Sequence, residues 1–423
     1  MDTGSPTLEA QMLAIGARAK AAAAIVRDGD RAMRTGALQA IARRLREGAA
    51  DILGANARDV ADGRAAGMAE AFVDRLRLDG PRVEAIACAV EEAAAIADPV
   101  GTVLASWTRP NGLHFDRVRT PIGVIGVIFE SRPNVAADAG ALALRAGNAV
   151  ILRGGSDSTR SVSAIGAALR LGLKDGGLPE DTIQIVPTPD RAAVGMMLRG
   201  LNGAIDVIVP RGGKSLVARV HEEARVPVFA HLEGVCHTYV HASADRAKAI
   251  AITLNAKMRR VSVCGSTETL LIDRAIAPAL LPAIAAALTN AGCALRGDAA
   301  ARAITPMDVA TEADWRAEYL AAVLSVRVVG DLDAAVAHIA TFGTSHTEAI
   351  IAEDSAAVEA FVKRVDSAIV IVNASTQFAD GGEFGFGGEI GIATGRLHAR
   401  GPVGAEQLTT FKYVVRGDGQ IRP

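Results

Sequence analysis

Hydrophobic residues near the amino terminus recur with the period of an α-helix. From Leu8 to Val26 they fall on one helical face, and Ser5 just before them can cap the helix. The segments Arg31–Ala50 and Arg82–Ala97 show a similar pattern. The first hundred residues are therefore predicted to be helical.

The pattern changes at Gly101, where larger apolar residues begin to alternate with smaller or polar ones. An Asn111-Gly112 pair follows, and Asn-Gly between alternating flanks favours a hairpin turn. We predict a partly polar β-hairpin over residues 101–119. Because an isolated hairpin is only marginally stable, we expect it to lie on another surface or another subunit.

After Pro121, short apolar runs alternate with helical segments. The predicted strands are Ile122–Phe129, Ala149–Leu152, Thr182–Val186, Ile205–Val209 and Pro227–Ala230. The predicted helices are Val135–Ala146, Thr159–Leu173, Arg191–Leu198 and Lys214–Glu223. Runs that are hydrophobic throughout are typical of strands covered on both faces, so this order predicts an α/β fold with a parallel, doubly wound sheet.

A second α/β series follows, with a domain boundary predicted near residue 235. Its predicted strands are His237–Val240, Glu268–Ile272, Ala322–Val329, Ala349–Ala352 and Ala368–Val372. Its predicted helices are Asp245–Met258, Ile276–Ala291, Asp333–Thr341 and Ser355–Arg364. A glycine-rich segment begins at Asp380, and a strand-like tail runs from Leu408 to Val415.

Composition narrows the class of protein. The 423 residues are 50% hydrophobic, and 45 Lys+Arg against 47 Asp+Glu leave a net charge of -2. This balance predicts no nucleic-acid partner and no polybasic membrane patch. The four cysteines form no C-x-x-C pair, so we expect no metal site. Neither a secretory signal nor a membrane-spanning run is visible, so we expect a cytoplasmic enzyme.

Two glycine turns at predicted strand ends are candidate anion sites. Arg153-Gly154-Gly155-Ser156 and Pro210-Arg211-Gly212-Gly213 each follow a strand and precede a helix. Glycine lets the backbone approach a ligand, and the next helix start offers N–H donors to a phosphate. Each turn alone could be a plain connection, but two in one sheet favour binding.

Cys264 and Asn134 are candidates for covalent chemistry. Cys264 lies between a predicted helix and a strand with Arg259 and Arg260 nearby, a setting that could lower its pKa. The alternative is a small buried hydrophobic residue. Asn134 follows the first predicted strand, where its amide could stabilise an oxyanion or simply cap the next helix. Cys236 is less suited to catalysis, because its neighbour His237 points to the opposite face of a strand.

Several blocks together resemble the aldehyde dehydrogenase superfamily, and within it the branch that reduces γ-glutamyl phosphate. The blocks are Pro121–Asn134, Ala146–Gly155, Val209–Gly213, Ser262–Cys264, Glu318–Leu320, Ser345–Ile350, Gly385–Gly391 and Leu397–Gly404. One departure is Gly265, where that branch often carries Asn.

The resemblance implies an aldehyde-dehydrogenase-like fold of three parts. Residues 1–235 would bind NADP, interrupted by the arm at 101–119. Residues 236–395 would carry the nucleophile, and residues 396–423 would form a bridging, oligomerising segment. A nucleotide site without the usual glycine fingerprint is also implied.

By matching position, Cys264 would be the nucleophile, with Asn134 and the Cys264 backbone N–H as the oxyanion hole. Arg153 would lie near the adenosine ribose and Glu318 near the nicotinamide ribose. Arg132 and His346 are candidates for binding the substrate anion. Glu233 lies near the place of a hydrolytic base, but its register is poor.

The implied reaction is NADPH-dependent reduction of L-glutamate 5-phosphate to glutamate 5-semialdehyde through a cysteine thioester, in proline biosynthesis. A homo-oligomer, dimer or tetramer, is implied, as is association with a glutamate 5-kinase. Two alternatives stay open: a hydrolytic aldehyde dehydrogenase, and a non-catalytic member kept for binding or assembly.

Overall fold

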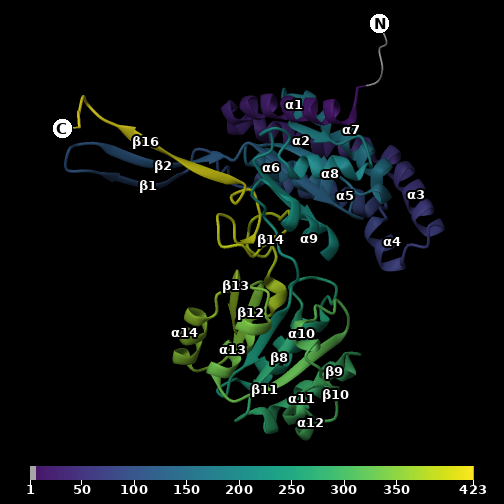
Figure 1. Ribbon diagram of the computed structural model, residues 1–423, viewed down its shortest axis with the longest axis vertical. Helices are drawn as coiled ribbons and strands as arrows, with labels where there is room; N and C mark the ends of the chain where they lie inside the picture. Colours follow the sequence, from purple (N-terminus) through teal and green to yellow (C-terminus); the bar gives the residue numbers. More distant parts are fainter. Residues whose placement is uncertain (1–5, 423) are drawn as a thin grey trace. The chain divides into compact units, whose positions relative to one another are not determined.

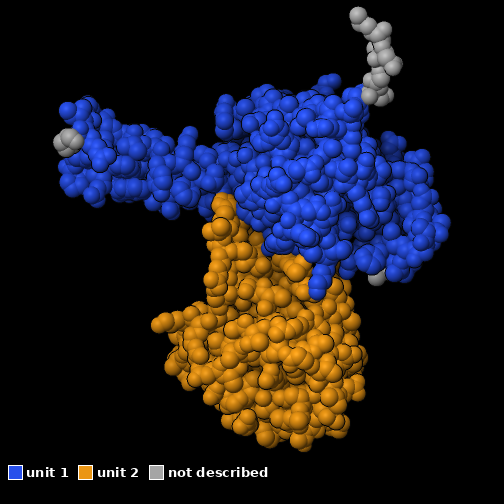
Figure 2. Space-filling model, in the orientation of Figure 1, with its two compact units in different colours: residues 1–230, 385–391, 403–423 blue, residues 231–384, 392–402 orange. Residues whose placement is uncertain are grey.

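The structure, a computed structural model, describes residues 6–422 and divides into two compact units (Figures 1 and 2). The first unit runs up to Ala230 and also includes Gly385–Gly391 and the chain from Val403 onward. The second unit comprises His231–Phe384 and Ile392–Pro402. The division falls a few residues before the boundary that the sequence predicts, and the carboxyl-terminal part contributes to both units.

The amino-terminal region of the first unit is helical, as predicted. Its helices are α1 (Leu8–Asp28), α2 (Arg31–Glu47), α3 (Ala49–Ala65), α4 (Glu70–Leu76) and α5 (Gly80–Ala95). The sequence predicts a helical region here without delimiting α3 or α4 as separate helices. Thr7 caps α1, because its hydroxyl accepts a hydrogen bond from the backbone N–H of Ala10 at 3.2 Å. The predicted cap, Ser5, lies outside the described residues.

A four-stranded parallel sheet forms the centre of the first unit, in the order β5-β4-β3-β6. Its strands are β3 (Val124–Phe129), β4 (Ala149–Arg153), β5 (Ile183–Ile185) and β6 (Val207–Arg211). The helices between and after them are α6 (Val135–Arg145), α7 (Thr159–Asp175), α8 (Arg191–Leu198) and α9 (Lys214–Glu223). Alternate strand residues such as Val124, Ile128 and Ile151 pack into a core with α1, α8 and α9, as the two-residue period of a strand requires.

The predicted strand Pro227–Ala230 is wrong. Only one isolated bridge, between Val228 and Ile208, remains of it. Proline has no backbone N–H to donate to a ladder, so Pro227 can only accept, which it does from the Ile208 N–H at 2.9 Å.

A long antiparallel arm extends from the first unit (Figure 1). It consists of β1 (Val103–Thr108), β2 (His114–Pro121) and β16 (Thr409–Arg416), in the order β1-β2-β16. The predicted hairpin is therefore confirmed, and the strand-like tail pairs with β2 as the third strand of the arm.

The aromatic residues of the arm share one face. Phe115 lies opposite both Trp107 and Val415, and residues opposite each other on paired strands point to the same side. Phe411 and Tyr413 alternate with Val415 along β16 and so join this face. Both are largely exposed, at 45% and 56% of their surface.

The second unit contains a seven-stranded parallel sheet in the order β10-β9-β11-β8-β7-β12-β13. Its strands are β7 (Cys236–Val240), β8 (Thr267–Asp273), β9 (Ala294–Gly297), β10 (Asp308–Val309), β11 (Val323–Val329), β12 (Thr347–Ile351) and β13 (Ile369–Val372). Its helices are α10 (Arg246–Met258), α11 (Ala277–Asn290), α12 (Ala299–Ile304), α13 (Leu332–Phe342) and α14 (Ser355–Arg364). A short ribbon of β14 (Ile392–Ala393) and β15 (Gly401–Pro402) follows.

Both faces of this sheet are covered. On one face Leu270 and Val326 pack into a core with α10, α11 and α12. On the other face Tyr239 and Leu271 pack with α13 and α14. The predicted doubly wound α/β architecture is therefore confirmed for both sheets, although the short strands β9 and β10 were not predicted.

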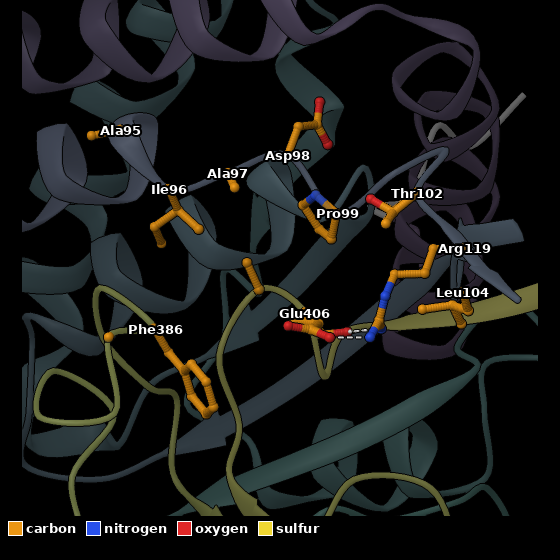
Figure 3. Close-up of a pocket in the computed structure, with 12 residues that line it drawn as sticks. Ala95, Ile96, Ala97, Asp98, Pro99, Thr102, Leu104, Arg119, Phe386 and Glu406 are labelled. Carbon is orange, nitrogen blue, oxygen red and sulfur yellow. Dashed lines mark hydrogen bonds and ion pairs between the residues drawn. The ribbon is translucent and has the colours of Figure 1, made fainter.

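At the base of the arm the first unit has a cavity of about 540 Å³ (Figure 3). The end of α5, the start of the hairpin and Phe386 line it, and Arg119 pairs with Glu406 at one side. It contains none of the predicted site residues. Among residues 6–422, no helix is long and apolar enough to cross a membrane.

Candidate active site

Three adjacent strands of the second unit bring the candidate nucleophile together with its neighbours. Strands β8, β7 and β12 lie side by side and are parallel, so their starts lie at one edge of the sheet. Cys264 precedes β8, Cys236 begins β7, and His346 precedes β12. The site of this unit therefore lies at the amino ends of its strands.

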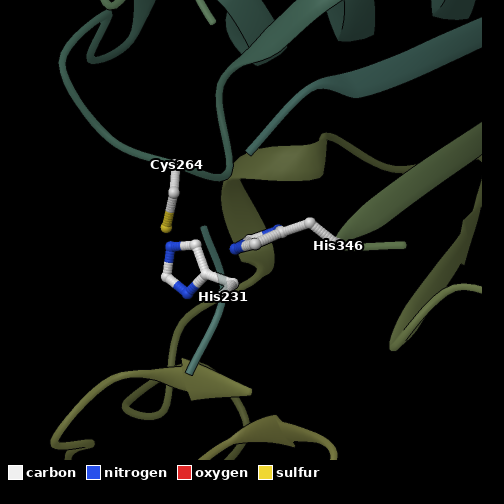
Figure 4. Close-up of side chains that lie close together, drawn as sticks. All are labelled: His231, Cys264 and His346. Carbon is white, nitrogen blue, oxygen red and sulfur yellow. The ribbon is translucent and has the colours of Figure 1, made fainter. Parts of the chain in front are cut away.

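Cys264 lies beside two histidines that contact each other (Figure 4). The Cys264 sulfur and one ring nitrogen each of His231 and His346 all lie within 4.8 Å of one another. The two imidazole rings meet edge to face, with centroids 4.8 Å apart. Sequence analysis placed His346 among the substrate contacts and missed His231, which lies in the irregular segment before β7.

The neighbours of Cys264 favour the thiolate form of its side chain. Burial raises the pKa of the Cys264 thiol, but the charge of His346 and a hydrogen bond from His231 lower it by more. The result is a pKa well below the usual value of a thiol. Because the thiolate is the reactive form of cysteine, Cys264 is prepared for attack on a carbonyl carbon.

Cys236 has the opposite character. Burial, and then the charge of Glu348, raise the pKa of its thiol well above the usual range. Its S–H donates to the Cys264 carbonyl oxygen at 3.1 Å, and its sulfur lies 3.6 Å from Nδ1 of His346. His237 instead bonds Glu348, with Nδ1 2.8 Å from Oε2. Cys236 therefore supports the loop of Cys264 and forms no reactive pair with His237.

A close backbone approach and a carboxylate complete this part of the site. A side chain on Gly234 would lie 2.2 Å from the Cys264 carbonyl oxygen, so only glycine fits there. Glu318 accepts a hydrogen bond from the Gly234 N–H at 3.0 Å. Burial raises the pKa of Glu318, and the negative charge of Cys264 adds to the effect.

Non-glycine residues with left-handed backbone lie beside these groups. Ser345, just before His346, has φ +59°, and Leu320, two residues after Glu318, has φ +51°. This conformation is unfavourable for residues with a Cβ and is concentrated at functional sites. The turns that carry His346 and Glu318 are thus held in place by the surrounding structure.

Asn134 lies in the first unit, at the start of α6. Its side chain makes no capping bond, and its Nδ2 donates to Oδ2 of Asp138 at 2.8 Å. The helix-cap alternative for Asn134 is therefore wrong. Its role in an oxyanion hole stays a prediction.

The first glycine turn follows β4. Arg153 is almost fully buried and donates from Nη2 to the Pro189 carbonyl at 2.7 Å, while its buried Nε has no hydrogen-bond partner among the described residues. Burial lowers the pKa of Arg153, and the charge of Glu130 opposes this. The guanidinium is thus fixed at the end of β4, and its positive charge suits an anionic ligand such as a nucleotide phosphate.

The second glycine turn leads from β6 into α9. The Gly213 N–H, at the start of α9, lies 3.4 Å from Oε2 of Glu130. A side chain on Gly212 would come within 2.7 Å of the same oxygen. The amino end of α9 favours a negative charge, and the Glu130 carboxylate lies there. Arg211 is the last residue of β6, just before this turn. Arg132 lies in the turn between β3 and α6 of the same unit.

Comparison with known proteins bears directly on this site. Residues 6–307 match the aldehyde dehydrogenase family. The chain belongs to that family. Its membership confirms the resemblance seen in the sequence and identifies an oxidoreductase of a family that uses a nicotinamide cofactor.

Individual relatives of this aldehyde dehydrogenase family member cover nearly its whole length. It is 62% identical to the gamma-glutamyl phosphate reductase of Rhodospirillum rubrum, over 97% of this chain and 96% of that protein. It is also 62% identical to the gamma-glutamyl phosphate reductase of Caulobacter vibrioides, over 97% and 100%. The crystal structure of gamma-glutamyl phosphate reductase from Thermotoga maritima is 42% identical, with a TM-score of 0.95 over 97% of this chain and 100% of that one.

Proposed function

We propose that this protein reduces L-glutamate 5-phosphate to L-glutamate 5-semialdehyde and phosphate, with NADPH as the reductant, as a step of proline biosynthesis. The observation that carries the chemistry is the placement of the Cys264 sulfur within 4.8 Å of a ring nitrogen of both His231 and His346, which favours the thiolate. The choice of substrate rests on relatives named gamma-glutamyl phosphate reductase that align over nearly the whole chain.

The residues divide the reaction between them as follows. The Cys264 thiolate attacks the acyl carbon, the C–O bond to phosphate breaks, and a thioester forms. Asn134 and the Cys264 N–H would stabilise the oxyanion of this step. When bound, the nicotinamide cofactor supplies the hydride that reduces the thioester. Collapse of the resulting thiohemiacetal frees the aldehyde and restores the thiolate.

The groups proposed to hold the cofactor are cationic or rich in N–H donors. Arg153, with Gly154 and Gly155, would meet the ribose end and its 2′-phosphate, which supports NADP over NAD. The turn Pro210-Arg211-Gly212 would also contact the cofactor, beside the Glu130 carboxylate at the start of α9. Glu318 would contact the nicotinamide ribose, and Arg132 the substrate anion.

One observation favours a second candidate, a hydrolytic aldehyde dehydrogenase. Glu318 has a raised pKa and its charge acts on Cys264, so it is a carboxylate that could activate water against a thioester. However, Glu318 already accepts a hydrogen bond from the Gly234 N–H, and this contact favours a role in binding over activation of water.

The experiment that tests the proposal generates γ-glutamyl phosphate in place with a glutamate kinase and ATP. We expect NADPH to be consumed in step with formation of glutamate 5-semialdehyde, and NADH to be used less efficiently. A protein that consumes no NADPH while the kinase is active, with Cys264→Ala as the blank, would contradict the proposed function.

A further inference from the structure

We propose that His231 is the acid–base partner of Cys264: it accepts the thiol proton and passes it to the departing phosphate oxygen. Transfer to phosphate rests on the proposed function above. Transfer from Cys264 depends on the protein alone and is tested without substrate.

A backbone carbonyl fixes the tautomer of His231. Its Nδ1 lies 2.7 Å from the carbonyl oxygen of Ile392, in β14. A carbonyl oxygen can only accept a hydrogen bond, so Nδ1 carries the hydrogen. In a neutral imidazole the other nitrogen, Nε2, is then an acceptor. His231 is thus held in the form that can take a proton at Nε2.

The accepting nitrogen faces the nucleophile. Figure 4 shows one ring nitrogen of His231 directed at the Cys264 sulfur and the other directed away from it. Because Nδ1 is bonded to Ile392, the nitrogen beside the sulfur is Nε2. Proton transfer from the sulfur to Nε2 leaves a thiolate next to an imidazolium.

His346 also acts on Cys264 through its charge, but its contacts do not define which of its nitrogens accepts a proton. Its Nδ1 lies 2.9 Å from the Thr347 hydroxyl and 3.6 Å from the Cys236 sulfur. Each of these groups can donate or accept, so neither fixes the tautomer of His346. His346 is fully buried and lies edge to face against His231, which holds that ring toward Cys264.

The proton balance of the acylation step follows. The Cys264 S–H bond breaks and a bond from hydrogen to Nε2 of His231 forms. The sulfur then bonds the acyl carbon, and the phosphate leaves with the electron pair of the C–O bond. The Nε2 proton passes to that oxygen, so phosphate departs as the hydrogen-phosphate dianion and His231 returns to its neutral form.

Three described groups face His231 and set its proton affinity together. Cys264 comes from the loop before β8, His346 from the turn before β12, and Glu318 from the segment before β11. The negative charges of the thiolate and Glu318 stabilise the imidazolium, and a charge on His346 opposes it. Proton transfer from Cys264 to His231 therefore places the imidazolium beside two negative charges.

The test measures the rate of alkylation of Cys264 by iodoacetamide against pH, in wild type, His231→Ala and His241→Ala. His241 is a matched control in the same unit, since its ring bonds Ser243 and it is no part of the site. We expect the midpoint of the His231→Ala profile to rise by at least one pH unit. We also expect turnover to fall about 10²–10⁴-fold, with partial recovery in added imidazole. The control should match wild type.

A profile for His231→Ala that overlies wild type would overturn the proposal. If that variant fails to fold, the thiolate of Cys264 is titrated in the wild-type protein by its ultraviolet absorbance near 240 nm. The Cys264→Ser variant serves as the blank for the other cysteines. Thiolate that persists well below the pH range of an ordinary thiol supports the pairing, and an ordinary thiol titration contradicts it. A shifted profile in a protein without reductase activity would support the pairing and contradict the proposed function.

Discussion

The side-chain amide of Asn134 is fixed by Asp138, one turn farther along α6, through a hydrogen bond of 2.8 Å from Nδ2 to Oδ2. An amide nitrogen carries two hydrogens, so this bond uses one of them and orients the other. The same bond explains why Asn134 does not cap its helix. It gives the proposed oxyanion donor a defined direction.

Asn134→Ala should lower kcat by about 10²–10³-fold, or about 3–4 kcal/mol of transition-state stabilisation, because one oxyanion donor is lost. The measurement is kcat together with the thermal unfolding midpoint. Because the change also removes the hydrogen bond to Asp138, we expect the midpoint to fall modestly, and kcat is compared at a temperature where both proteins are folded. Normal turnover with a lowered midpoint would show that Asn134 only supports the fold.

Asp138→Asn should raise stability in a pH-dependent way. Burial raises the pKa of Asp138 to about 6, opposed by the Asn134 bond and Arg211. A carboxyl group whose pKa is higher in the folded than in the unfolded protein stabilises the fold when it is protonated. That stabilisation is complete below the pKa of the unfolded state and is lost as the pH rises through about 6. The asparagine variant should therefore gain up to about 3 kcal/mol over wild type at pH 8 and almost nothing at pH 4. If the variant and the wild type had the same thermal unfolding midpoint at pH 8 as well as at pH 4, this prediction would be wrong.

Cys236→Ala should retain turnover within about tenfold of wild type, whereas Cys264→Ala should lose the reaction and still bind NADPH. The physical reason is the contrast between a buried thiol that stays protonated and a thiolate stabilised by imidazoles. Initial rates and cofactor fluorescence distinguish the two variants. An active Cys264→Ala with an inactive Cys236→Ala would reverse the assignment.

Much of the fold follows from apolar patterning because both sheets are buried on their two faces. Strands such as Val124–Phe129 are continuous hydrophobic runs, which stand out from the helices around them. Helix α3 was not delimited as a separate helix because its buried face includes Asn56, Asp59 and Gly63, so it lacks a clear apolar stripe. Strands β9 and β10 are too short to form a pattern.

The candidate site was only partly predictable. Cys264 was singled out because the residues around it match a sequence motif of the aldehyde dehydrogenase family. His346 lies in another such motif. His231 gives no comparable signal: it lies in an irregular segment, and only the tertiary fold brings residues 231, 264 and 346 together. Sequence reasoning weighed Glu233 as a nearby base and passed over the histidine two positions before it.

The exposed aromatic face of the arm should hold a homo-oligomer together. Replacing Trp107, Phe411 and Tyr413 with serine should give smaller species in light scattering, because buried aromatic residues often contribute about 2 kcal/mol or more each to an interface. Lys412→Ser is the matched control, since Lys412 lies on the opposite face of β16. An unchanged mass for the triple variant would mean that the arm packs within its own chain.

The most direct measurement of the central claim is NADPH production from glutamate 5-semialdehyde and NADP at rising phosphate concentration. If phosphate is the acyl acceptor of the Cys264 thioester, steady turnover should be near zero without phosphate, after a burst of at most one NADPH per site. It should rise to saturation with phosphate, and arsenate should replace it. Full turnover in phosphate-free buffer, with glutamate as the product, would contradict the account. If the Glu318→Gln variant lost that turnover, the protein would be a hydrolytic aldehyde dehydrogenase.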